Sequence, residues 1–269
     1  MVKQQNDIER DISGWLNAYR YPMQRSRARF HYRVNELPLT EVAAQKYDEE
    51  GKAKPFQGLS LVTFLNPQSA VFQNLKAVTE RLRRDYQDAD IEDSFAFLPP
   101  DTWHITIADL VVTDDRRIQN HVVEQITQCF EKLQIEHLTA PQFYLRSDLV
   151  VSAGTSVVSL AEPKDEQSLI DIQRIRRMIA GEFEPSYVSV TPQNADNFIG
   201  HVTGWYFRKA FDTQRYSRFK EIMQWYDLHK ESLGEVFVNS IELRRFTSME
   251  AWGKRPLAEL KLAPNSELR

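Results

Sequence analysis

Apolar residues along the chain follow two spacings, one typical of strands and one typical of helices. Short runs rich in β-branched and aromatic residues predict strands at 58–65, 95–98, 103–112, 142–153, 155–163, 186–192, 198–207 and 235–246. Apolar residues three or four apart predict helices at 67–82, 114–133, 165–183 and 212–229. Strands and helices thus follow one another in a similar order in both halves of the chain.

This order predicts an α+β fold with two lobes, each an antiparallel sheet flanked by helices, and a cleft between them. Pro67 and Ser69 open the first of these helices, Asp212 is the expected N-cap of the last, and Cys129 falls on the apolar face of the second. We expect a bilobal domain at 57–250, an N-terminal arm at 1–56 and a C-terminal tail at 251–269.

The composition narrows the class of protein. The formal net charge of −4 gives no overall attraction to nucleic acid, although a local basic patch would suffice for a small phosphate ester or an RNA end. The single cysteine excludes an internal disulfide, and no apolar run approaches the ~20 residues of a membrane span. With a polar, charged start, the sequence predicts a cytoplasmic protein.

Two predicted strands carry a histidine, a spacer and a threonine: His104 with Thr106, and His201 with Thr203. Side chains two apart on a strand share a face, so each histidine points the same way as its threonine. If the halves are related by a pseudo-two-fold axis, all four side chains meet. A third match at 137–139 follows a helix and precedes Pro141, so we regard it as a chance occurrence.

These four side chains suit a phosphodiester. Imidazole titrates near neutral pH, so one ring can act as a base while the other acts as an acid. The threonine hydroxyls can donate to the non-bridging oxygens, where negative charge develops. Two ordinary histidines, buried or on the surface, are the alternative.

Two further residues are candidates for binding substrate. Trp205 lies two residues after Thr203 and is expected on the same face, where it would stack on a base; burial in the core is the alternative. Either Arg244 or Arg245 must face away from the core on the last strand, and we take Arg245 as the phosphate contact over a surface ion pair. No common metal, nucleotide-loop or nucleophile motif occurs, so no cofactor and no metal are expected.

The two motifs in their apolar surroundings, WHITIADL and GHVTGWYF, resemble those of the 2H phosphoesterase superfamily. The resemblance covers roughly residues 57–250, and residues 46–67 also resemble the start of the first lobe in an uncharacterised branch. It implies two pseudo-symmetric lobes, with His104, Thr106, His201 and Thr203 as the catalytic residues. The arm lies outside the family pattern.

The function expected from the motifs and the resemblance is hydrolysis, without a metal, of a cyclic phosphodiester of the 2′,3′ type. Its partner would be a nucleotide or an RNA end carrying the cyclic phosphate, with no membrane and no obligate protein partner. The alternative is a binding module that holds the same ligand without turnover, helped by arginines and aromatic residues of the arm.

Overall fold

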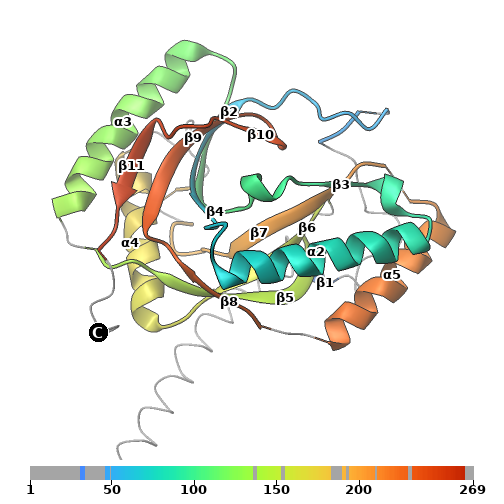
Figure 1. Ribbon diagram of the computed structural model, residues 1–269. Helices are drawn as coiled ribbons and strands as arrows, with labels where there is room; N and C mark the ends of the chain where they lie inside the picture. Colours follow the sequence, from blue (N-terminus) through green and yellow to red (C-terminus); the bar gives the residue numbers. More distant parts are fainter. Residues whose placement is uncertain are drawn as a thin grey trace, which may run out of the picture.

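The computed structural model describes residues 31–33, 46–48, 50–135, 138–152, 155–182, 190–191, 194–209, 211–229 and 232–263 (Figure 1). The helices are α2 (Ala70–Asp88), α3 (Arg116–Ile135), α4 (Glu166–Glu182) and α5 (Thr213–Leu228), with 3-10 turns at Glu92–Ser94 and Pro100–Thr102. The strands are β1 (His31–Arg33), β2 (Gly58–Phe64), β3 (Phe95–Phe97), β4 (His104–Val112), β5 (Gln142–Ser152), β6 (Ser156–Pro163), β7 (Gly200–Phe207), β8 (Ser232–Phe237), β9 (Ser240–Ser248), β10 (Ala251–Trp252) and β11 (Ala258–Lys261).

All these strands belong to one antiparallel sheet. Its order is β1-β5-β6-β7-β4-β2-β9-β10, while β3 pairs with β7, β8 with β5 and β11 with β9. β4 and β7 meet in the middle, where Ile105 lies opposite Val202. The α+β prediction is therefore confirmed, and the two motif strands are neighbours at the junction of two half-sheets.

The helices pack on the sheet face that points away from the two motif histidines. One core cluster joins Ile105, Ile107 and Val202 to residues of α2, α3 and α4, and a second joins Trp205 and Phe207 to α2 and α5. Cys129 is fully buried in the first cluster, as predicted. Among the described residues, none of the helices combines the length and the apolar character that a membrane span requires.

Local signals place the helix ends correctly. The Ser69 side chain accepts a hydrogen bond from the backbone of Phe72 and so caps α2, and Asp212 accepts one from Arg215, which confirms the predicted cap of α5. Each cap supplies an acceptor to an N–H that has no partner inside its helix.

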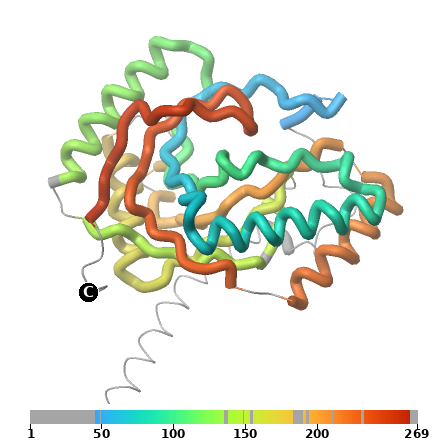
Figure 2. Tube along the Cα trace, viewed as in Figure 1, coloured from blue at the N-terminus to red at the C-terminus, as the bar shows by residue number. Residues whose placement is uncertain are grey.

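The predicted strand 235–246 is in fact two strands. The strand is interrupted at Val238 and Asn239, where the Val238 N–H donates to the Pro141 carbonyl. β8 stays with β5, whereas β9 crosses to the other half-sheet and pairs with β2 (Figure 2). Pairing partners far away in the sequence thus divide a run that looks continuous.

The sheet also extends beyond the predicted domain boundary at residue 250. β10 and β11 both pair with β9, so residues 251–261 form part of the fold. At the other end, β1 of the predicted arm adds an edge strand to β5. Most of the predicted strand 186–192 lies outside the described residues.

Candidate active site

The pairing of β4 with β7 brings the two motifs together. Because Ile105 lies opposite Val202 in an antiparallel pair, His104 falls opposite Thr203 and His201 falls opposite Thr106. Ile105 and Val202 point into the core, and all four motif side chains therefore occupy the other face, which we call the histidine face. The two histidines lie on one diagonal of this group of four, and the two threonines lie on the other. Diagonal neighbours in an antiparallel pair have Cα atoms about 7 Å apart.

Each imidazole is held in the same way. The His104 Nδ1 atom lies 2.6 Å from the carbonyl oxygen of Thr102, and the His201 Nδ1 atom lies 3.1 Å from that of Ile199. In both cases the carbonyl belongs to the residue two positions earlier in the chain. A carbonyl only accepts, so Nδ1 carries the proton and donates it. In the neutral form of each ring, Nε2 is therefore the nitrogen that carries no proton.

The two rings differ in their surroundings. The Trp252 ring lies edge-on at 4.4 Å from the His104 ring, and Phe64 lies 5.5 Å away. Burial lowers the pKa of His104 to about 4, against the opposing effects of the Thr102 carbonyl and the charge of Asp109. Burial also lowers the pKa of His201, again opposed by its carbonyl partner and by Asp109.

A bulge in β7 changes the predicted place of Trp205. Thr203 pairs with Val158, but the next pair in register joins Trp205 to Val157, so one extra residue is inserted at Gly204. The bulge turns Trp205 to the core face, where it is 1% exposed. The prediction that Trp205 shares a face with Thr203 and stacks on a substrate is therefore wrong.

Tyr206 takes the position on the histidine face instead. Its side chain is hydrogen-bonded to that of Thr203, and burial raises its pKa to about 12. A bulge after Thr106 likewise places Asp109 on this face. The sequence analysis missed both residues, although each lies five positions after a motif histidine. That matched offset is the signal by which they could have been found.

The candidate phosphate contact also differs from the prediction. Arg244 lies opposite Ser60 and reaches over the Phe64 ring at 5.1 Å, so it is on the histidine face. It pairs with Glu242 and donates to the Gly253 carbonyl. Arg245, on the other side of β9, is close enough to Arg116 for that charge to add to burial in lowering its pKa. The alternation of the strand therefore rules against Arg245 as a contact.

Residues 46–48 and 50–56 connect the two half-sheets beside the site. The Tyr47 hydroxyl donates to Glu250, which follows β9, at 2.8 Å. The centre of the Tyr47 ring lies 6.4 Å from that of the Tyr206 ring on β7. Phe56 stacks on Phe246 at 5.5 Å. The end of the predicted arm is thus packed against the domain next to the candidate site.

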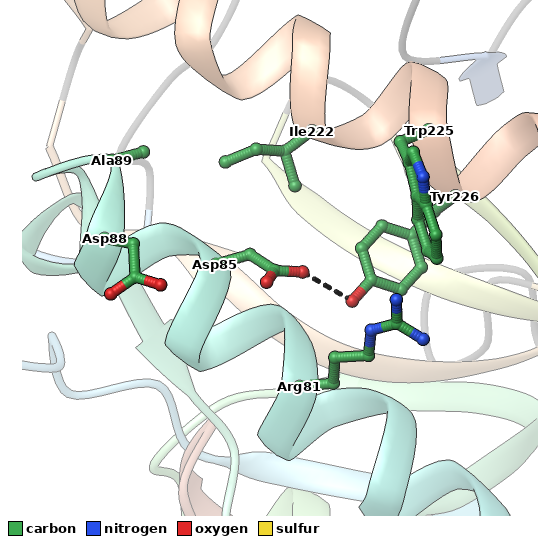
Figure 3. Close-up of a pocket in the computed structure, with 7 residues that line it drawn as sticks. All are labelled: Arg81, Asp85, Asp88, Ala89, Ile222, Trp225 and Tyr226. Atoms are coloured by element: carbon green, nitrogen blue, oxygen red, sulfur yellow. Dashed lines mark hydrogen bonds between the residues drawn. The ribbon is translucent and has the colours of Figure 1, made fainter.

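A pocket of about 450 Å³ lies elsewhere, between α2 and α5 (Figure 3). The Tyr226 hydroxyl donates to Asp85 across it, and Trp225 lies between the Arg81 guanidinium and the His229 ring. Tyr226 shares a core cluster with Trp205, so this pocket is on the side opposite the histidine face. It contains none of the predicted site residues.

The remaining candidates are a metal site and the third match to the motif, at 137–139. Within the part of the chain described here, no three His, Cys, Asp or Glu side chains gather in a way that could hold a metal ion. In the third motif match, His137 lies outside the described residues, and Thr139 donates to Asp171 at 2.6 Å.

Solved structures of low sequence identity are similar to this chain, and the first of those named here shows the fold. The conserved protein of unknown function ATU0111 from Agrobacterium tumefaciens str. C58 aligns with a TM-score of 0.53 and 15% identity, over 82% of this chain and 93% of its own. TT0787 of Thermus thermophilus aligns with a TM-score of 0.48 and 15% identity, over 77% of this chain and 98% of its own. A structure described as a phosphoesterase aligns with a TM-score of 0.44 and 13% identity, over 78% of this chain and 99% of its own.

Comparison with sequences finds a family model that matches part of the chain. A search of curated proteins finds no match to the chain. Residues 46–146 match the family model 2H-phosphodiest, described as a domain of unknown function (DUF1868). The matched range includes His104 and Thr106, and His201 and Thr203 follow it. The resemblance to the 2H phosphoesterase superfamily inferred from the two motifs is thereby confirmed over residues 46–146.

Proposed function

We propose that this protein hydrolyses a cyclic phosphodiester of the 2′,3′ type on RNA ends or small nucleotides, without a metal. The match of residues 46–146 to the 2H-phosphodiest model supports phosphoesterase activity in general. The observation that carries the finer proposal is the pairing of Ile105 with Val202, which gathers two imidazoles and two hydroxyls on one face.

The reaction needs one neutral and one protonated imidazole. We assign the base to His104, because Trp252 and Phe64 surround its ring and favour the neutral form. His104 Nε2 removes a proton from water as the water oxygen bonds to phosphorus. His201 Nε2 donates its proton to the ribose oxygen as the bond from that oxygen to phosphorus breaks, giving a phosphomonoester.

The threonines contribute by binding the phosphoryl group. They occupy the second diagonal of the site, so their hydroxyls flank a phosphorus atom held between the histidines. Each hydroxyl can donate to a non-bridging oxygen, whose negative charge grows as water attacks. The hydrogen bond between Thr203 and Tyr206 limits the rotation of the Thr203 side chain.

The test is a product assay. Purified protein would be incubated with the four nucleoside 2′,3′-cyclic monophosphates and with a short RNA ending in a cyclic phosphate, always with EDTA. His104→Ala and His201→Ala would be compared with wild type, and His229→Ala, at an exposed site after α5, would serve as the control.

We expect turnover in EDTA that both site variants lose and the control keeps. Full activity in either site variant would refute the paired mechanism. Tight binding of a cyclic nucleotide with no product over hours would favour the binding module instead.

A further inference from the structure

A carboxylate lies on the histidine face because of a bulge in β4. Val62 pairs with Thr106, but the next pair joins Leu61 to Ala108, so one extra residue is inserted at Ile107. Asp109 then falls opposite Ser60, and the Ser60 hydroxyl donates to its carboxylate at 3.0 Å. Without the bulge, strict alternation would turn Asp109 towards the core.

The pairing of the strands places Asp109 beside the histidine pair. Thr106 lies opposite His201, and Asp109 is the next position of β4 on the same face. Its charge acts on groups from four parts of the fold: Lys46 of the segment 46–56, His104 of β4 itself, Arg176 of α4, and His201 and Tyr206 of β7.

We propose that Asp109 is a positioning residue whose carboxylate holds on the histidine pair the single proton that the reactive form requires. This inference rests on the proposed function, since only an acid–base pair needs one neutral and one protonated ring. The carboxylate would act through the histidines, and it need not touch the substrate.

The surroundings of the pair explain why such a charge is needed. Burial disfavours the charged form of both rings, and each imidazolium would also repel the other. A nearby carboxylate offsets both effects, and the pKa of each histidine is indeed raised by Asp109. The positive charges of Lys46 and Arg176 oppose the negative charge of Asp109. The net charge around Asp109 therefore decides how far it raises the pKa values of the histidines.

The two cations near Asp109 are also held by other groups. The Arg176 guanidinium donates to the carbonyls of Ala195 and Ile107. The Lys46 ammonium lies 3.5 Å from the centre of the Phe56 ring. Because these contacts do not involve Asp109, both cations should keep their places in a variant that lacks its charge.

The experiment is a set of pH–rate profiles with a 2′,3′-cyclic nucleotide. Asp109→Asn removes the charge with little change of shape, and Asp109→Glu restores it. Asp114→Asn, on the exposed loop after β4, is the matched control. We expect Asp109→Asn to move both limbs of the bell-shaped kcat profile to lower pH by about one unit, a shift typical of a nearby charge.

The expected loss is therefore about tenfold at pH 8, above the alkaline limb, and it disappears on the acid limb, where the variant should be faster than wild type. Asp109→Glu should recover most of the wild-type profile, and Asp114→Asn should leave it unchanged. A profile that keeps its shape, or one that is lowered equally at every pH, would overturn the proposal.

A second measurement does not depend on turnover. NMR titration of the imidazole signals, assigned with His104→Ala and His201→Ala, reports the pKa of each ring directly. A lower pKa for the pair in Asp109→Asn supports the proposal, and an unchanged one overturns it. If wild type turns over no cyclic nucleotide, the proposed function fails, and this titration still tests the role of Asp109 separately.

Discussion

β4 and β7 carry the same motif and the same kind of bulge after it, but their histidines lie in different surroundings. On β4 the rings of Trp252 and Phe64 pack against His104. On β7, His201 lies opposite Leu160 of β6. The fifth residue after the histidine is Asp109 in one strand and Tyr206 in the other. The backbone thus repeats while the surrounding side chains do not, which gives two identical side chains two different environments.

The largest effect should come from removing either member of the pair. His104→Ala and His201→Ala should each lower kcat for a 2′,3′-cyclic nucleotide by about 1000-fold, within the range for a lost general acid or base. If the roles differ as proposed, His104→Ala should remove the acid limb of the pH profile and His201→Ala the alkaline limb. Loss of the same limb in both variants would contradict the assignment.

The next effect separates the two faces of β7. Trp205→Ala should lower the free energy of unfolding by about 3–5 kcal/mol, because it empties a buried aromatic site. Tyr206→Phe should lower it by only about 1 kcal/mol, the value of one hydrogen bond.

Urea unfolding measures both changes, and Trp225→Ala, at a half-exposed position on α5, is the control for loss of an indole. A small effect for Trp205→Ala would mean that the bulge does not turn this side chain into the core.

An effect smaller than that of Trp205→Ala concerns burial of His104. Its pKa is about 4 in the folded protein and near 6.5 when unfolded, so between these values the unfolded chain binds more protons. The free energy of unfolding should therefore fall as the pH falls, and this residue should account for about 2 kcal/mol between pH 7 and 5. His104→Gln should reduce that fall when urea unfolding is compared at the two pH values. Equal falls in both proteins would show that His104 is not held neutral.

Much of the local structure could be predicted because local spacing controls it. The four described helices occur where apolar residues repeat at helical spacing, and Ser69 and Asp212 cap two of them. The motif histidines and threonines share a face because each pair is two residues apart, before any bulge. Cys129 is buried for the same reason, since it continues the apolar face of α3.

The errors arise where strands choose their partners. Strict alternation places Trp205 on the wrong face, because the pairing of β6 with β7 contains a bulge. The choice of Arg245 over Arg244 is wrong because the pairing of β2 with β9 decides which of the two faces the site. The run 235–246 resembles one strand because nothing in its composition shows that its two parts pair with different half-sheets.

The sequence by itself determined the four described helices and most of the strands, and it determined the two motifs that predicted the superfamily. Only the tertiary structure decided that β4 and β7 are neighbours, that Asp109 and Tyr206 join the histidine face, and that Trp205 leaves it. Spacing along a chain fixes the direction of side chains within one element. Register and bulges depend on hydrogen bonds between strands distant in the sequence, so those features exist only once the sheet has formed.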